Sequence, residues 1–228
     1  IGSKSLFGYM IRTRLSDGFP ILTTRKVSLR IAFEETMFFL RGQTDTKILE
    51  NKNINIWKGN TSREFLDKVG LSHLPEGDMG KGYSHQWRSF GKNETFSGVD
   101  QTANLLHDLK SNPSSRRHIV SGWNPVQLNE AALPPCHILN QYQVSDGKLN
   151  SLFYMRSNDV LYGLPYNYMS YALLNHIFAK YLKLEPGNLI YSCGDAHLYL
   201  NQLQIAEQQT YREPFALPSL VIHKDLNT

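Results

Sequence analysis

Cysteine is scarce in this sequence, and long apolar runs are missing from it. The chain has only two cysteines, Cys136 and Cys193, too few for the disulfide framework of a small secreted domain. No segment resembles a signal peptide, and no apolar run approaches the length needed to cross a bilayer. These absences predict a protein without a membrane segment that works in a reducing, cytoplasmic compartment.

The sequence also lacks repeats, low-complexity tracts and linkers, so we expect one domain over residues 1–228. The net charge is +4, but the basic residues are scattered, with neither a long Lys/Arg run nor zinc-finger spacing. Asp195 and His197 lie close together without a third or fourth ligand at metal-binding spacing, so we expect no metal. A phosphorylated small molecule fits this charge as well as nucleic acid does, and needs fewer positive charges.

Apolar periodicity and turn signals predict an α+β fold with a mixed β-sheet packed with helices. We expect a helical turn and a loop over 60–82, and a hairpin turn at Asp146-Gly147. Predicted helices span 28–42, 99–112, 169–187 and 196–209, and predicted strands span 117–123, 137–144, 148–155 and 188–194.

Three polar segments stand out as candidate chemistry. Cys136 follows Pro134-Pro135, which stiffen the backbone, so the thiol is either a structural residue at the start of a strand or an aimed nucleophile. His137 is a poor base for it, because neighbours on a strand point to opposite faces. Arg116-Arg117 suits a phosphate or a solvated surface.

The segment 154–171 lies between two apolar stretches and is dense in Arg, Ser, Asn and Asp. Arg156 and Ser157 could hold an anion there, and the Asn167 amide could bind the edge of a heterocycle. The alternative is ordinary turn and cap chemistry, which Asn and Asp side chains perform routinely.

Taken together, the motifs resemble the thymidylate synthase family along nearly the whole chain, in the same order. This resemblance implies a thymidylate synthase-like fold with one sheet face at a homodimer interface. It also implies that segments preceding and following this chain occur in the family. The matching strings include "LFGYMIRTRLSDGFPILTTRK", "FEETMFFLRGQT", "INIWKGNTSREFLD", "GDMGKGYSHQWRSFG", "SRRHIVSGWNP", "ALPPCH", "MRSNDV", "GLPYN" and "GDAHLYLNQ".

The resemblance implies that Cys136 is the nucleophile that adds to C6 of a pyrimidine nucleotide. Arg156 and Ser157 resemble the residues that bind the nucleotide phosphate, and Arg156 is expected to favour the thiolate. Arg116 and Arg117 resemble a pair that reaches the phosphate in the neighbouring subunit. The partners implied are therefore dUMP, a folate and a second copy of the chain.

Other positions match residues that handle the base, the sugar and proton transfers in the family. Glu35 resembles the carboxylate that organises proton transfer near O4, and Tyr83 a residue that assists chemistry at C5. Asn167 resembles the residue that binds N3 and O4 of uracil, which favours dUMP over dCMP. His197 and Tyr199 resemble the pair that holds the sugar 3′-hydroxyl.

The co-substrate implied by the resemblance is 5,10-methylenetetrahydrofolate. Asp159 resembles the partner of its pterin ring, and Trp57 resembles a residue packed beside it. Tyr162 and Gly163 follow Asp159 and are expected at the same folate site.

Departures from the synthase pattern favour the hydroxymethylase branch of the family, in which water rather than hydride adds to the C5 methylene. Met155, Tyr162, Lys58 and Cys193 replace Gln, Leu, Asp and Gly, and "GKGYS" replaces "GPVYG". "MRSND" resembles phage nucleotide hydroxymethylases. The expectation is therefore a dUMP hydroxymethylase that makes 5-hydroxymethyl-dUMP.

Two alternatives stay open. One is a divergent thymidylate synthase that makes dTMP and dihydrofolate. The other is a nucleic-acid-binding protein that keeps the enzyme fold, although the presence of Cys136 and Asn167 speaks against it.

Overall fold

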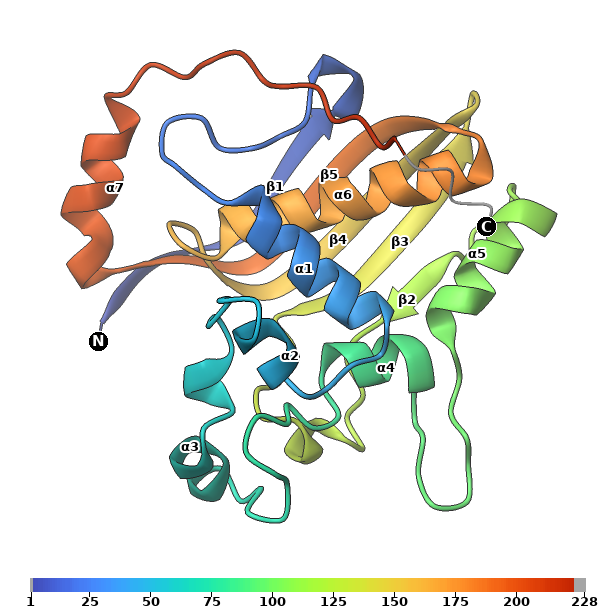
Figure 1. Cartoon of the computed structure of the whole chain (residues 1–228). Helices are drawn as coiled ribbons and strands as arrows, with labels where there is room; N and C mark the ends of the chain where they lie inside the picture. Colours follow the sequence, from blue (N-terminus) through green and yellow to red (C-terminus); the bar gives the residue numbers. More distant parts are fainter. Residues whose placement is uncertain (1, 224–228) are drawn as a thin grey trace.

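A five-stranded mixed sheet forms the centre of the protein (Figure 1). The computed structural model describes residues 2–223. The strand order is β1-β5-β4-β3-β2, in which β4 and β5 are parallel and the other neighbours are antiparallel. The strands are β1 (Ser3–Arg14), β2 (Ile119–Ser121), β3 (His137–Ser145), β4 (Lys148–Asp159) and β5 (Glu185–Tyr199).

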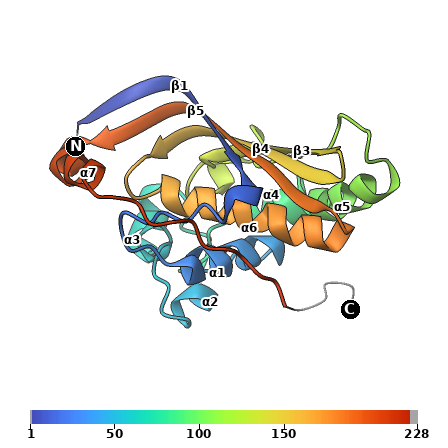
Figure 2. The ribbon, with the colours of Figure 1, turned by 90° about the horizontal axis from the view of Figure 1, so that it is seen from above.

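The helices gather on one side of this sheet. Figure 2 shows α6 and α1 beneath the strands, whereas the opposite face of the sheet is bare. The α-helices are α1 (Leu29–Leu40), α2 (Lys47–Glu50), α3 (Arg63–Lys68), α4 (Tyr83–Ser89), α5 (Gln101–Ser111), α6 (Leu164–Leu182) and α7 (Leu203–Thr210). The predicted α+β class with a mixed sheet is confirmed.

The core lies between α6 and the central strands. Phe153 on β4 is fully buried, and its ring stacks on Tyr171 of α6 with centroids 4.1 Å apart. Tyr191 on β5 packs against the same Phe153 ring. Asn175, also buried, donates from Nδ2 to the carbonyl oxygen of Leu149, which ties α6 to β4 by a polar contact as well. The helix that carries Asn167 is therefore held rigidly on the sheet.

Three local signals predicted element boundaries correctly. The helix predicted at 28–42 is α1, and Gly42 follows it with φ 67, a conformation that suits glycine. The helix predicted at 99–112 is α5, which begins where the Asp100 carboxylate accepts the N–H of Ala103. The Asp146-Gly147 turn, with positive φ at both residues, joins β3 to β4 as predicted.

Three other boundaries were wrong because sheet pairing overrides local pattern. The helix predicted at 169–187 runs from Leu164 to Leu182, and the Pro186-Gly187 pair lies inside β5. The first part of the helix predicted at 196–209 is strand, because β5 continues to Tyr199 between β1 and β4. The strand predicted at 117–123 shortens to β2.

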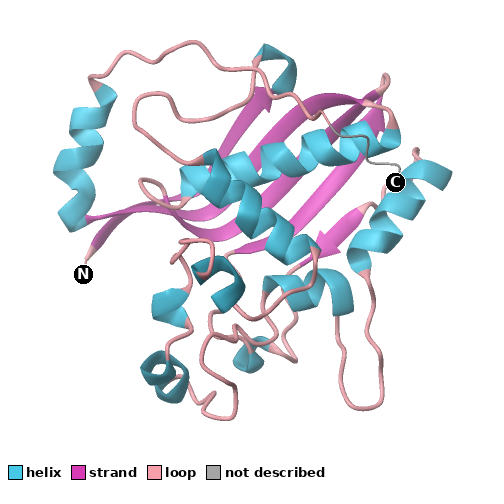
Figure 3. Ribbon diagram, in the orientation of Figure 1, coloured by secondary structure: helices cyan, strands magenta, loops and turns pink. Residues whose placement is uncertain are grey.

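The sequence reasoning missed β1 entirely. Gly8 interrupts this segment. Both faces of the strand are largely exposed, so the sequence lacks the alternation of apolar and polar residues that would indicate a strand. Between α1 and β2, Figure 3 shows short helices joined by loops, and the predicted helical turn at the start of 60–82 is α3. These loops contribute one wall of the candidate site.

Phe153→Ala tests this core. The substitution should lower the free energy of unfolding by about 3–5 kcal/mol, since it removes a ring that is buried against two others. Urea denaturation followed by circular dichroism measures the loss. Val126→Ala is the matched control because Val126 is 89% exposed, and it should change stability by less than about 0.5 kcal/mol. Equal effects of the two substitutions would contradict the proposed core.

Candidate active site

The backbone at Cys136 is held by two groups from distant parts of the chain. Its N–H donates to the Tyr83 hydroxyl oxygen at 2.7 Å, and its carbonyl oxygen accepts the N–H of Arg156 at 2.8 Å. Cys136 is half-buried beside fully buried neighbours, so its sulfur lies at the edge of the core. The rigid setting expected from Pro134-Pro135 is therefore reinforced by tertiary contacts.

Arg156 places a positive charge beside the thiol. Its guanidinium donates to the carbonyl oxygens of Pro134 and Pro135, and Nη2 lies 3.7 Å from Cys136 Sγ. The indole of Trp123 lies 5.9 Å from the guanidinium carbon. The guanidinium is thus a fixed positive charge next to the sulfur. Sequence reasoning missed Trp123, which no local pattern distinguishes from a core residue.

His137 is not a base for Cys136. Its ring stacks on Tyr83 with centroids 3.9 Å apart, and Nδ1 hydrogen-bonds the Tyr171 hydroxyl at 2.8 Å. Burial lowers the pKa of His137 to about 3, so the imidazole is neutral at physiological pH. The side-chain hydrogen bond of His137 within the described residues goes to Tyr171 and not to Cys136, in keeping with the prediction that it is a poor base for the thiol.

Glu35 on α1 lies in an aromatic corner. Its carboxylate accepts the indole N–H of Trp57 at 2.8 Å, and the Trp57 and Tyr83 rings lie 6.0 Å apart. Burial raises the pKa of Glu35 to about 7, although the bond from Trp57 opposes that rise. A carboxyl group with this pKa can give and take a proton near neutral pH.

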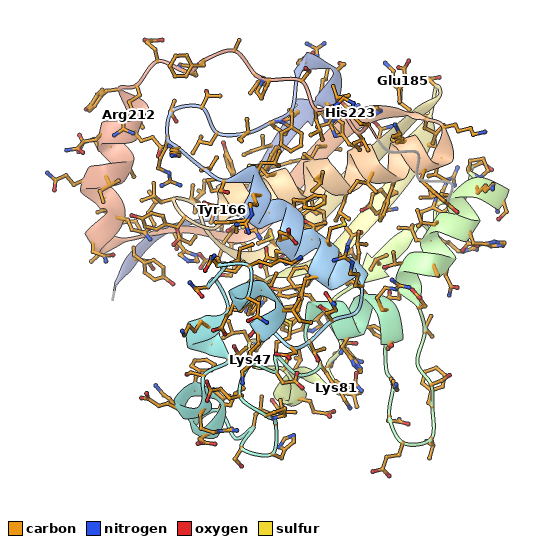
Figure 4. The ribbon with its side chains drawn as sticks, in the orientation of Figure 1. Lys47, Lys81, Tyr166, Glu185, Arg212 and His223 are labelled. Atoms are coloured by element: carbon orange, nitrogen blue, oxygen red, sulfur yellow. The ribbon has the colours of Figure 1, made fainter. Side chains whose placement is uncertain are left out.

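A tight loop at Gly80 precedes Tyr83 and fixes its position. Gly80 has φ +65, and a Cβ there would lie 2.2 Å from the carbonyl oxygen of Glu130, so only glycine fits. Lys81 binds the Glu130 carboxylate at 2.6 Å (Figure 4 labels Lys81). Burial and the nearby Cys136 raise the pKa of Tyr83 well above its usual value, so its hydroxyl keeps its proton.

Asp159 ends β4 and organises the turn into α6. Its Oδ1 accepts the backbone N–H groups of Leu161 and Tyr162 at 2.9 and 3.0 Å. A Cβ on Gly163 would lie 2.9 Å from the Asn158 amide oxygen and 3.6 Å from that of Asn167. The turn therefore places Asp159, Tyr162, Gly163 and Asn167 together.

The end of β5 lies beside this turn. His197 is paired with Asp159 in the parallel register, and its carbonyl oxygen accepts the N–H of Val160 at 2.9 Å. The His197 ring bonds the Asp195 carboxylate at 3.1 Å and packs edge-on to Tyr199, 5.2 Å away. Ser157 is paired with Asp195, so the predicted nucleotide residues of β4 and β5 are neighbours.

Arg116 and Arg117 lie apart from this cluster. Both are exposed on the loop before β2, and within residues 2–223 no ion pair involves either guanidinium. Arg116 lines a cavity of about 460 Å³ that also contacts Gln141, Leu152 and Ile190. The contacts described above link the predicted residues around Cys136 to one another, and likewise those at the ends of β4 and β5, whereas none of these contacts involves Arg116 or Arg117.

The comparisons with known proteins are consistent. The sequence profile of the family described as Thymidylate synthase matches residues 1–228. The chain belongs to the thymidylate synthase family. It is similar to thymidylate synthase 1/2 of Encephalitozoon cuniculi, with 45% identity over 97% of this chain and 78% of the relative.

Two bifunctional dihydrofolate reductase-thymidylate synthases are also similar to this family member. The protein from Paramecium tetraurelia is 43% identical over 97% of this chain and 50% of its own length. The protein from Glycine max is 43% identical over 100% of this chain and 45% of its own length. The chain therefore spans about half the length of these bifunctional relatives.

The expectation of a hydroxymethylase was wrong. Relatives with 41–45% identity over nearly the whole chain are named thymidylate synthase, alone or as part of a bifunctional enzyme, and none of them is named a hydroxymethylase. The family profile carries the same name. The phage-like assignment has no support in these comparisons either.

Several of the replaced positions have local structural partners. Met155 is 1% exposed, lies on the face of β4 opposite to Arg156, and is paired with the buried Cys193, so these two residues form a core pair. Tyr162 is 49% exposed, and the guanidinium of Arg25 lies 5.2 Å from its ring. These contacts are structural and do not by themselves indicate a different reaction.

Two of the replaced positions carry surface ion pairs. Lys58 lies 3.7 Å from the Glu50 carboxylate, and Lys81 binds Glu130 as described above. Over residues 2–223 there is no group of three or more His, Cys, Asp or Glu side chains arranged to hold a metal ion. Across the same residues, no helix combines the length and the apolarity that a membrane crossing requires.

Glu35→Gln tests the electrostatics of the site. Because the pKa of Glu35 is raised in the folded protein, its stabilising contribution is full below pH 4.5 and is lost as pH rises through about 7. At pH 8.5 ionisation should cost the folded wild type about 3 kcal/mol, which the variant avoids. Urea unfolding at pH 5 and pH 8.5 should therefore show that most of the stability that the variant gains relative to wild type appears at the higher pH.

Glu64→Gln is the control, since Glu64 is exposed on α3 and should show no such pH dependence. A constant difference between Glu35→Gln and wild type at both pH values would show that Glu35 titrates normally.

Proposed function

We propose that this protein is a thymidylate synthase, which makes dTMP and dihydrofolate from dUMP and 5,10-methylenetetrahydrofolate. The observation that carries the proposal is the Cys136 thiol, fixed through Tyr83 and Arg156 and lying 3.7 Å from the Arg156 guanidinium. Family membership and the names of the relatives support the same reaction.

In the proposed mechanism, Cys136 attacks C6 of the uracil ring. The S–C6 bond forms as the C5–C6 double bond opens, and the electron pair moves through C5 to O4 as an enolate. Arg156 stabilises the attacking thiolate and, with Ser157, binds the phosphate. When the reaction ends, Cys136 leaves C6 and the double bond returns. The temporary S–C6 bond thus makes C5 nucleophilic.

Glu35 and Asn167 are proposed to act on the base. Glu35, with a pKa of about 7, can protonate O4 as the enolate forms and accept that proton later. Asn167 lies in the first turn of α6, and its amide can accept from N3–H and donate to O4 of uracil. His197 and Tyr199 at the end of β5 are placed to bind the 3′-hydroxyl of the sugar.

The folate site is assigned to the turn between β4 and α6. The residues fit a pterin: Asp159 offers a carboxylate acceptor, and Trp57 and Tyr162 offer flat rings that are not fully buried. When bound, methylenetetrahydrofolate supplies the one-carbon unit and then the hydride that completes the methyl group. The residues of this chain are proposed to orient the pterin against the base and to exclude water. Their positions matter because a small displacement of the pterin slows group transfer strongly.

Product analysis tests the proposed function. Wild-type protein incubated with dUMP and methylenetetrahydrofolate should give dTMP by mass spectrometry, with an equimolar rise of dihydrofolate by absorbance. Cys136→Ser should bind dUMP but lose turnover by at least about a thousandfold, since an alcohol is a far weaker nucleophile than a thiolate. Cys193→Ser is the matched control and should retain activity. A product with the mass of 5-hydroxymethyl-dUMP, or undiminished turnover in Cys136→Ser, would contradict the proposal.

We also propose that the protein works as a homodimer through the bare face of the sheet. Residues in register on neighbouring strands share a face, and one row lies opposite to the buried Phe153: Arg12, Ile190, Leu152, Gln141 and Ile119. Three of these five side chains are apolar, and an apolar patch on a sheet face favours contact with a partner surface. Arg116 lines a cavity on the same face, which would place it near a second subunit.

Mixed dimers test the proposed sharing of residues. Arg117→Ala and Cys136→Ser should each abolish most activity as homodimers. If Arg117 serves the other subunit, a heterodimer of the two variants contains one complete site, with Cys136 from one chain and Arg117 from the other. Mixing after mild denaturation should therefore restore activity. No recovery in mixtures that sedimentation shows to contain heterodimers would refute the sharing, as would a fully active monomer.

A further inference from the structure

We propose that Gln202 is a positioning residue that orients the Asp159 carboxylate toward the pterin. This inference rests on the proposed function. Gln202 closes the single 3₁₀ turn at Leu200–Gln202 that follows β5, and its side chain is buried. Nothing in the sequence pattern marked it, because glutamine at the start of a helix is common.

The carboxamide of Gln202 spans two parts of the site. Its Nε2 donates to Asp159 Oδ2 at 2.9 Å, and its Oε1 accepts the backbone N–H of Tyr199 at 3.1 Å. The first bond reaches 43 positions along the chain, from the end of β5 to the end of β4. One buried amide thus joins the proposed pterin partner to the strand end that carries the sugar-binding pair.

The bonding pattern demands an amide. To cap the 3₁₀ turn, Gln202 needs only its Oε1, which accepts the backbone N–H of Tyr199. The donor nitrogen is directed instead at Asp159, whose Oδ1 is already occupied by the N–H groups of Leu161 and Tyr162. With Oδ1 saturated and Oδ2 held by Gln202, the carboxylate plane is fixed from both ends. One lone pair of Oδ2 then remains for a pterin N–H.

The surrounding charges do not replace this contact. His197 is paired opposite Asp159 and bonds Asp195, and Arg25, from the loop after β1, donates to the carbonyl oxygen of Leu161. None of these groups makes a hydrogen bond to the Asp159 carboxylate among the described residues. Gln202 is the side chain that holds it.

Gln202→Met removes both bonds while keeping a side chain of similar volume. The KM for methylenetetrahydrofolate should rise about tenfold, the effect of a lost hydrogen bond to a charged group. The KM for dUMP should change less than threefold. Equilibrium binding of tetrahydrofolate to the dUMP complex, measured by calorimetry, should weaken in parallel. Gln204→Met is the matched control, because Gln204 is exposed two positions later.

Gln202→Glu provides a readout that a purely structural role would not move. The introduced carboxyl can still accept the Tyr199 N–H, but it can donate to Asp159 only while protonated. Two carboxyl groups at this distance share a proton, so the shared proton is held to a higher pH than either group alone would hold it. Folate binding should therefore approach that of wild type at low pH and weaken as pH rises. Gln204→Glu should follow the wild-type pH profile, including any titration of His197.

The outcomes separate cleanly. Folate binding by Gln202→Met equal to that by wild type, or a pH profile of Gln202→Glu equal to that of Gln204→Glu, would overturn the positioning role. Circular dichroism and thermal melting identify a variant that fails to fold, and Gln202→Glu then decides the question at low pH, where its bonds are restored. Loss of dUMP and folate binding together in both folded Gln202 variants would also overturn it. Failure of wild type to make dTMP would instead contradict the proposed function, since the calorimetric test does not require turnover.

Discussion

The hydrogen bond from the Cys136 backbone N–H to the Tyr83 hydroxyl is the contact on which the candidate site depends. It joins the segment before β3 to helix α4, next to the short antiparallel bridge between Gly80 and Ala131. The Tyr83 ring stacks on His137, so the residue after the thiol is locked into the core. The Cys136 backbone and the His137 ring are both fixed. The position of the sulfur is therefore set by packing rather than by a flexible loop.

Burial sets the protonation of the ionisable groups near the thiol. His137 is kept neutral inside the core, where its imidazole serves as a packing group and hydrogen-bond partner. Glu35 is buried beside the indole N–H of Trp57, which leaves its carboxyl group ready to exchange a proton near neutral pH. Arg156 supplies the positive charge at the thiol. An acid–base group, a cation and a nucleophile are thus placed within one aromatic corner.

The fold class and several element boundaries could be predicted from local sequence patterns. The roles predicted for Cys136 and for the polar run from Arg156 to Asn167 stay predictions, although Arg156 lies beside the thiol and Asn167 lies in the first turn of α6, which follows β4. Sequence reasoning failed at β1 and at residues 196–199, where pairing across the sheet decides the backbone and no local periodicity reports it. Gln202 was missed for the same reason, since its partner is distant in sequence.

The error over the reaction branch has a physical origin as well. Met155 and Cys193 looked like changes in the pocket because they adjoin motif residues along the chain, yet alternation along the strands turns Met155 to the opposite face from Arg156. Neighbours in sequence are not neighbours in the site. A substitution next to a motif bears on chemistry only after its strand face is known.

The most direct test of the account is to trap the nucleotide on the thiol. A fluorine at C5 of dUMP cannot leave as the proton at C5 does, so a reaction that proceeds through an S–C6 bond should stop with the nucleotide attached. Mass spectrometry of protein treated with 5-fluoro-dUMP and methylenetetrahydrofolate should find one adduct per chain, on the peptide containing Cys136. An adduct on Cys193, or none at all under conditions that convert dUMP to dTMP, would contradict the assignment of the nucleophile.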